Sequence, residues 1–222
     1  MTKNSLEESR IPDADKGPVI VLGRQFGSGG RRIGQMLASR LGWDYYDKEL
    51  LAEAAKHLGF SPDIFAANDE KRPSYFNSFL QGVYGIPSNF HNSSVGSSSL
   101  YAAQSEVIRK IGDKGRCVIV GRTADYVLRD HPGLLSIFLH SPIEHRAARI
   151  VERNDATTPA QAAELARRHD RDRENYYNFF TGRHWGHADN YHVSIDASLF
   201  SDEDIADMII NLVEKKKKKK TL

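Results

Sequence analysis

The sequence has little cysteine and no long apolar run. Its 222 residues include one cysteine, Cys117, so a disulfide framework is excluded. Cys117 lies in the apolar run CVIVG, where we expect a small buried side chain and not a nucleophile or a metal ligand. No apolar stretch approaches the ~18 to 20 residues of a membrane span, and residues 1–16 lack the apolar centre of a signal peptide. We therefore expect a cytoplasmic protein without a membrane span.

The sequence also lacks a strong excess of one charge. The formal net charge is +2, and six consecutive lysines, Lys215–Lys220, account for the basic balance, so the rest of the chain is slightly acidic. A nucleic-acid-binding domain more often has basic residues spread over one face. We expect no specific nucleic-acid partner, and we interpret residues 215–222 as a disordered lysine-rich tail.

Short apolar runs alternate with helical patterns along the chain. Helix starts are indicated by Ser141 with Glu144, by Thr158 with Gln161 and by Ser201 with Asp204. Because three of the runs are almost entirely apolar, they are typical of parallel strands buried on both faces. The alternation predicts one α/β domain over residues 17–214, after a flexible N-terminus, with a doubly wound parallel sheet. Strands are predicted at residues 18–22, 43–46, 117–121, 135–139 and 191–195.

The stretch VIVLGRQFGSGGRRIG, residues 19–34, predicts a buried strand, a glycine-rich turn and a basic helix. A Walker loop of this kind carries a lysine for charge and a hydroxyl for Mg²⁺. Here Gly30 occupies the position of the lysine, and Arg24 occupies that of the first glycine. A guanidinium can replace the ammonium group electrostatically, although it cannot replace the hydroxyl. The residues predicted to bind phosphate are Gly27, Ser28, Gly29, Gly30, Arg31 and Arg32.

Two other interpretations of this stretch stay open. One is a structural turn that binds nothing. The other is a dinucleotide site of an oxidoreductase, because Gly27 and Gly29 fit the pattern G-x-G-x-x-G and Asp47 follows 20 residues after Gly27. The third glycine position of that pattern is occupied by Arg32, which makes the oxidoreductase the weaker interpretation.

Arginines that follow the later strands suggest phosphoryl chemistry. Arg122 comes directly after the predicted strand at 117–121, where the cleft of a doubly wound sheet opens. The segment RRHDRDR, residues 167–173, then places Arg168, Arg171 and Arg173 with Asp170 and Asp172. Phosphoryl transfer depends on positive charges that converge on the phosphates from separate elements. For residues 167–173, a helix surface with i,i+4 ion pairs is the structural alternative.

Taken together, these stretches resemble the cytidylate kinase-like family of P-loop proteins, which are relatives of bacterial CMP kinase. The resemblance covers about residues 18–213 and depends on RQFGSGGRRIG, LGWDYYDKELL, CVIVGRTADYVL, LSIFLHSPIEHRAARI and RHDRDRENYYNFFTGRHWG. It implies a three-layer α/β/α fold of the P-loop NTPase type with a five-stranded parallel sheet. It also implies an acceptor-binding lobe at about residues 50–105 and a lid at about 155–185. The chain departs from CMP kinase at Val120 and Thr123, where the family has acidic residues, and of the family's DSGAxYR stretch it keeps only Asp47.

The resemblance implies ATP-dependent phosphoryl transfer, with ATP and Mg²⁺ as cofactors, to a small acceptor such as CMP or dCMP. In this interpretation, loop amides with Arg31 or Arg32 hold the donor phosphates, and Arg122 and Asp47 bind the acceptor. The residues expected to act on the transferring group are Arg122, Arg168, Arg171 and Arg173, with Asp170 or Asp172 placing Mg²⁺ or an arginine. A homodimer is compatible with this interpretation. The alternative is a nucleotide-binding module that has lost kinase activity and acts as a sensor or partner protein.

Overall fold

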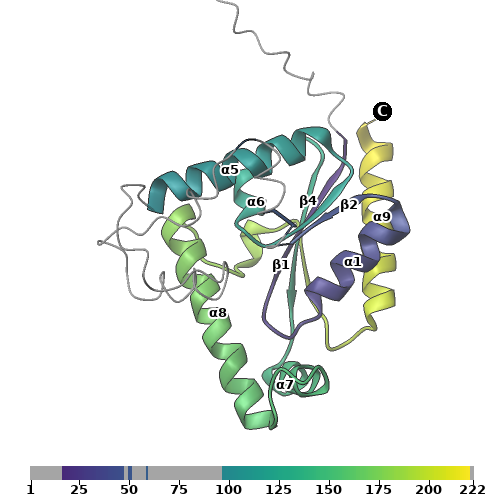
Figure 1. The fold of residues 1–222 in the computed structure, drawn as a ribbon. Coiled ribbons are helices and arrows are strands. Elements are labelled where there is room, and N and C mark those ends of the chain that lie inside the picture. The colour runs from purple at the N-terminus through teal and green to yellow at the C-terminus, as the bar shows by residue number, and fades with distance from the viewer. Residues whose placement is uncertain (1–16, 48–49, 52–58, 60–96, 221–222) are drawn as a thin grey trace, which may run out of the picture.

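The structure is a computed structural model that describes residues 17–47, 50–51, 59 and 97–220 (Figure 1). The expected N-terminal segment and most of the expected acceptor-binding lobe lie outside these residues. The fold and the candidate site are therefore derived from the strands, the helices that flank them and their connecting loops.

A five-stranded parallel sheet in the order β2-β3-β1-β4-β5 forms the centre of the molecule. The predicted doubly wound parallel sheet is thereby confirmed. Since β1 lies between β3 and β4, the order reverses at β1, and ligands of such sheets bind at the carboxyl ends of the strands around this point. The strands are β1 Val19–Arg24, β2 Asp44–Tyr46, β3 Cys117–Val120, β4 Leu134–His140 and β5 Val193–Asp196.

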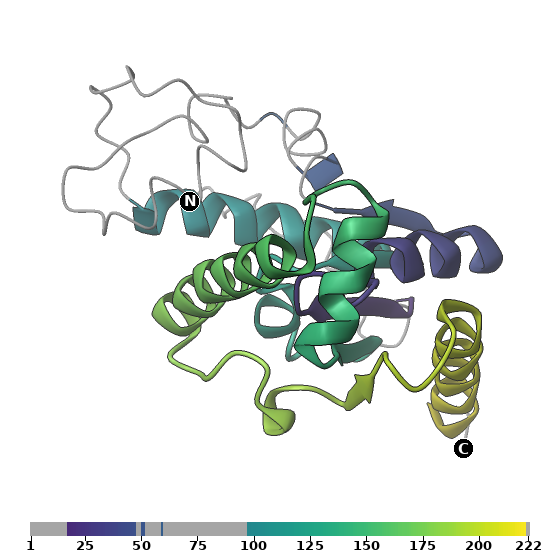
Figure 2. The ribbon, with the colours of Figure 1, turned by 90° about the horizontal axis from the view of Figure 1, so that it is seen from below.

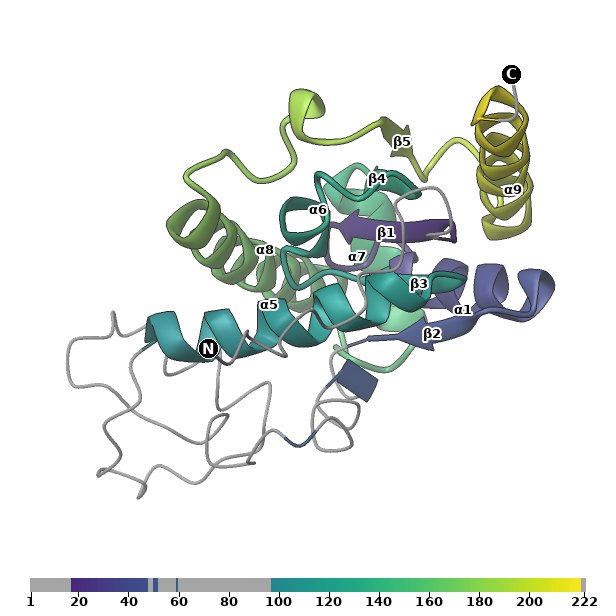
Figure 3. The ribbon, with the colours of Figure 1, turned by 90° about the horizontal axis from the view of Figure 1, so that it is seen from above.

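Helices cover both faces of this sheet and complete the three layers (Figures 1 and 3). Alternate residues of β1 point to opposite faces of the sheet. Ile20 and Leu22 pack against α1 and α9, whereas Val19 and Val21 pack against α5, α6 and α8. Helix α7 packs beside α8 below the sheet (Figure 2). The helices are α1 Gly30–Leu41, α5 Ser97–Lys114, α6 Ala124–Val127, α7 Ile143–Glu152, α8 Pro159–Thr181 and α9 Asp202–Lys220, with a 3-10 turn at Ala188–Asn190.

Two of the three predicted helix caps are confirmed. The Thr158 hydroxyl accepts a hydrogen bond from the Gln161 amide, and Ser201 and Asp204 exchange hydrogen bonds between side chains and backbone amides. The prediction for Ser141 was wrong. Pro142 is the N-cap of α7, and the Ser141 hydroxyl instead lies 3.0 Å from Nδ1 of His145.

The lysine run also differs from the expectation of a disordered tail. Helix α9 continues through it to Lys220. Lysine has a high helix propensity, and positive charge near the carboxyl end of a helix is favoured by the helix dipole. Among the described residues, no helix has both the length and the apolar character that a membrane span requires.

Candidate active site

The glycine-rich turn follows β1 and leads into α1. Gly27 and Gly29 have φ values of +86° and +89°, a left-handed conformation that other residues rarely adopt. A Cβ atom on Gly29 would also lie 2.8 to 3.0 Å from the Arg149 guanidinium. The turn therefore requires glycine for its backbone conformation, and Arg149 packs directly against it.

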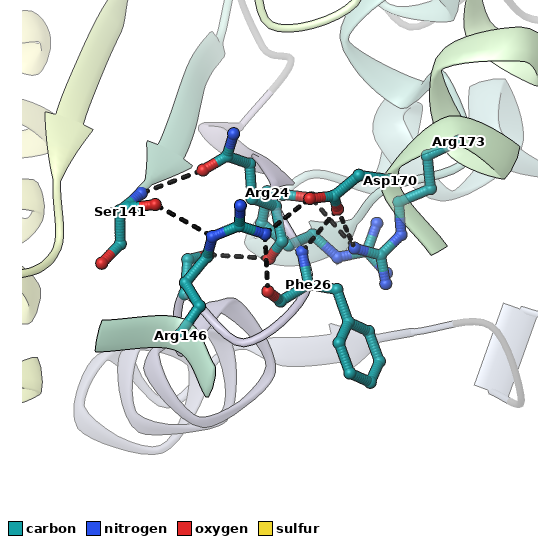
Figure 4. A network of polar contacts seen from close by, with 8 residues as sticks. Arg24, Phe26, Ser141, Arg146, Asp170 and Arg173 are labelled. Atoms are coloured by element: carbon teal, nitrogen blue, oxygen red, sulfur yellow. Dashed lines mark hydrogen bonds and ion pairs between the residues drawn. The ribbon is translucent and has the colours of Figure 1, made fainter. Parts of the chain in front are cut away.

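Arg146 and Asp170 form hydrogen bonds to the backbone of the turn and to each other (Figure 4). The Phe26 amide donates to Oδ1 of Asp170 at 2.7 Å, and Nη1 of Arg146 donates to Oδ2 at 2.6 Å. Arg146 also donates to the carbonyl oxygens of Phe26 at 3.1 Å and of Ser141 at 2.9 Å. The Arg146 side chain is buried, with 8% exposure, and the Asp170 side chain is half-buried, with 15% exposure. The turn is thus attached to α7 and α8, which come from much later in the sequence.

Four arginines meet beside the turn. In addition to Arg146 on α7, they are Arg24 at the end of β1, Arg122 after β3 and Arg173 on α8, whose Nη1 donates to the Arg24 carbonyl at 3.2 Å. Burial lowers the pKa of Arg173 to about 10. Asp170 opposes this decrease, and the charges of Arg122 and Arg146 add to it. Burial, followed by the charges of Arg173 and Arg122, lowers the pKa of Arg24. Because a guanidinium group stays charged in proteins, the cluster favours an anion.

A strained turn places Arg122 at this cluster. Gly121, Arg122 and Thr123 have φ values of +79°, +64° and +54°, so three consecutive residues are left-handed. This conformation is unfavourable for the β-branched Thr123 in particular and costs about 1 to 3 kcal/mol. Gln104 donates to the Arg122 carbonyl at 3.3 Å, and the Thr123 hydroxyl lies 3.2 Å from the hydroxyl of Tyr101. Such strain is found preferentially at functional sites, which supports a functional position for Arg122.

Arg31 and Arg32, predicted to hold phosphates, each pair with a buried carboxylate. Arg31 donates through Nε and Nη2 to Oδ2 of Asp47, at 3.1 and 2.9 Å. Nε of Arg32 lies 2.6 Å from Oδ2 of Asp202, and Arg149 binds both oxygens of the same carboxylate at 2.9 and 2.7 Å. The structure therefore joins the predicted donor residue Arg31 to the predicted acceptor residue Asp47.

The predicted residues of α8 divide into two groups. Asp170 and Arg173 face the turn, whereas Arg168 and Arg171 are exposed. Arg146 and Arg149 were not among the residues predicted from the sequence. Their spacing of three in EHRAAR would have indicated that both lie on the same side of a helix.

A buried carboxyl lies in α6, close behind this edge of the sheet. The Tyr177 hydroxyl donates to Oδ2 of Asp125 at 2.8 Å. Burial raises the pKa of Asp125 to about 6, although the hydrogen bond from Tyr177 and the charge of Arg183 oppose the increase. Asp125 could not be predicted from the sequence, since a single aspartate in a short helix gives no pattern.

The residues around the turn suit a polyphosphate better than they suit Mg²⁺. Left-handed glycines, a helix N-terminus and converging guanidinium groups are groups that bind phosphate. The hydroxyl of Ser28 donates to the Gln25 carbonyl at 2.9 Å, and Arg31 stands where a Walker loop has its metal-binding hydroxyl. Both oxygens of Asp170 are already bonded. The described residues therefore fit a polyphosphate and do not provide the usual protein ligand of Mg²⁺.

Several solved structures are similar to this chain. An uncharacterised protein from Eubacterium ventriosum is 25% identical with a TM-score of 0.66, over 89% of this chain and 98% of that chain. A gluconokinase from Sinorhizobium meliloti is 16% identical with a TM-score of 0.50, over 90% and 93%. A shikimate kinase from Bacteroides thetaiotaomicron is 11% identical with a TM-score of 0.51, over 89% and 98%. The likeness to these two kinases concerns the fold alone.

A search of curated protein sequences returned no match. The sequence model of the cytidylate kinase-like family matches residues 19–199, which is most of the chain and includes the turn, Arg122 and all of α8. The chain therefore belongs to the cytidylate kinase-like family and has the α/β fold of P-loop kinases.

Proposed function

We propose that this protein transfers a phosphoryl group from ATP to a small acceptor, and that the acceptor is a nucleoside monophosphate such as CMP or dCMP. The observation that carries the proposal is the convergence of Arg24, Arg122, Arg146 and Arg173 beside the glycine turn. Membership of the cytidylate kinase-like family supports the choice of reaction and acceptor.

The chemistry asks mainly for position and charge. The transferring phosphoryl group carries its charge on peripheral oxygens, so a protein accelerates the reaction by aligning the two substrates and by stabilising that charge. ATP supplies the phosphoryl group. The protein supplies the backbone amides of Gly27, Gly29 and Gly30 at the N-terminus of α1 for the donor phosphates.

The positions of the side chains support the remaining roles that we propose. Arg122, fixed by the strained turn after β3, binds the phosphate of the acceptor. Asp47 holds the guanidinium group of Arg31 by two hydrogen bonds, and we assign this pair to binding of the acceptor. Arg173 stabilises the transferring group, and the exposed Arg168 and Arg171 complete this role when α8 and the substrates come together.

The test measures ADP release from Mg-ATP with CMP, dCMP, UMP, AMP and GMP as acceptors and with no acceptor. We expect turnover that depends on the acceptor and that falls about 100-fold or more in Arg122→Ala, as for removal of a donor to a developing charge. Arg171→Ala is expected to lower turnover as well. The matched control is Arg40→Ala, which removes an exposed arginine at the other end of α1. Full turnover in both Arg122→Ala and Arg171→Ala would show that the assigned roles are wrong.

A nucleotide-binding module without catalysis is the second candidate, and one contact favours it. Asp170 places a carboxylate on the Phe26 amide of the turn, where an anionic ligand could otherwise bind. Protection of the protein by ATP against thermal unfolding, without ADP release in the presence of any acceptor, would support this candidate.

A further inference from the structure

We infer that Arg24 supplies to the donor phosphates the positive charge that the Walker lysine supplies in other P-loop proteins. The inference rests on the proposed function and assigns one residue to it. In this chain the cation comes from the end of β1, at the position of the first Walker glycine. The position of the lysine is occupied by Gly30.

The space at Gly30 is the first argument. Gly30 is the first residue of α1 and is not among the residues with positive φ, so its backbone conformation does not require glycine. A Cβ atom on Gly30 would nevertheless lie 2.8 Å from Cγ and 2.9 Å from Cβ of Arg24. Glycine is needed at position 30 because the side chain of Arg24 fills the space where a lysine would begin.

The direction of Arg24 is the second argument. Its side chain passes under Gly30, and its guanidinium packs onto Gly121 so closely that a Cβ atom there would overlap Nη1. The guanidinium is therefore held between the carboxyl ends of β1 and β3, next to Arg122 and Arg173. In a doubly wound sheet this is the ligand-binding edge.

The partners of the neighbouring arginines are the third argument. Arg31, Arg32, Arg146 and Arg149 each form an ion pair with a carboxylate. In the part of the chain that the structure describes, the guanidinium of Arg24 has no carboxylate within ion-pair distance. Its charge is therefore available for a ligand, and a guanidinium offers five N–H donors to phosphate oxygens.

The residues at 24 and 30 thus form a reciprocal exchange. A Walker loop has glycine at the position of Arg24 and lysine at the position of Gly30. In this chain the cationic residue and the glycine have exchanged positions. Each residue accounts for the other, because Arg24 excludes a lysine at 30 and the glycine at 30 admits Arg24. The exchange predicts that charge can be restored from position 30 once the side chain at 24 is removed.

The test measures binding of ATP and of inorganic tripolyphosphate by calorimetry for the full chain and five variants. We expect Arg24→Gln, which keeps most of the volume, to weaken both affinities at least tenfold. Arg24→Gly is expected to do the same, and Gly30→Lys alone is expected to disturb the turn and bind poorly. The double variant with Arg24→Gly and Gly30→Lys is expected to regain at least tenfold in affinity over Arg24→Gly. Arg40→Ala is the control and is expected to bind like the original protein.

The outcomes separate this inference from the proposed function. If the original protein binds neither probe, the proposed function fails and the inference fails with it. If the original protein binds ATP and Arg24→Gln binds equally well, the function stands and Arg24 is not the cation. A double variant no better than Arg24→Gly would likewise overturn the exchange. A purely structural role for Arg24 does not predict rescue by a lysine on a different element, so rescue of a folded double variant supports the inference directly.

Discussion

Replacement of Asp125 by asparagine should make the protein more stable at neutral pH. Burial raises the pKa of this carboxyl from 3.8 to about 6. Between these two pH values the folded protein binds more protons than the unfolded chain, so its stability falls as the pH increases through this interval. Above about pH 6 the carboxylate is charged in both states and the full cost is present. At 1.36 kcal/mol for each pKa unit, this cost is about 3 kcal/mol.

Asparagine keeps an oxygen that can accept the hydrogen bond from Tyr177 and cannot ionise. We therefore expect Asp125→Asn to raise the free energy of unfolding at pH 7.5 by about 2 to 3 kcal/mol. The difference should disappear as the pH approaches about 4. The charged and titratable groups around the carboxyl are Tyr177, Tyr191 and Arg183, and neither tyrosine ionises in this range, since burial raises the pKa of each.

Urea unfolding of both proteins at a series of pH values from about 4 to 8 measures the difference. Asp130→Asn is the matched control, because it makes the same replacement at an aspartate that is 88% exposed. A stability difference between Asp125→Asn and the original protein that stays constant over the series would refute the reasoning. A variant that is less stable at pH 7.5 would show that the ionised carboxylate contributes more through Tyr177 and Arg183 than its burial costs.

Three further predictions concern the surroundings of the site. Arg146→Ala should lower the free energy of unfolding by about 3 kcal/mol in urea titrations, because it leaves half-buried Asp170 without its closest cation; a loss below 1 kcal/mol would contradict this. Burial raises the pKa of Cys117 to about 12, so a thiol reagent should modify the protein only after unfolding, as absorbance of the released chromophore would report. Gly121→Ala should weaken ATP binding without removing a charge, because the added methyl group would displace the Arg24 guanidinium. An unchanged ATP affinity in calorimetry would contradict this prediction.

The strands in the middle of the sheet could be predicted from the sequence, because burial on both faces requires an uninterrupted apolar run. Val19 to Leu22 and Cys117 to Val120 are fully apolar runs that end in glycine, and both are central strands. The glycine turn could be located for the same kind of reason, since left-handed residues such as Gly27 and Gly29 leave few alternatives. The predicted phosphate-binding turn and the predicted Arg122 therefore lie at the same edge of the sheet.

The partners of the arginines could not be predicted from the sequence. Arg31 and Arg32 are adjacent in the sequence, yet the first pairs with Asp47 and the second with Asp202 at the start of the last helix. Helical spacing indicates which residues share a face and says nothing about a carboxylate that another element contributes. The phosphate-binding role predicted for Arg31 or Arg32 did not take these two carboxylates into account. Arg24 was not among the predicted phosphate-binding residues, because the Walker motif has glycine at its position.

The charge of Arg24 should have opposite effects on folding and on binding. Burial and two neighbouring guanidinium groups lower its pKa, which means that the charged form is unfavourable in the folded protein without a ligand. Arg24→Gln should therefore unfold at a higher temperature than the original protein when no ligand is present. With saturating ATP the order should reverse, because only the original protein gains the charge-assisted hydrogen bonds. A structural arginine would instead make the variant less stable under both conditions, so thermal unfolding with and without ATP distinguishes a residue retained for a ligand from one retained for the fold.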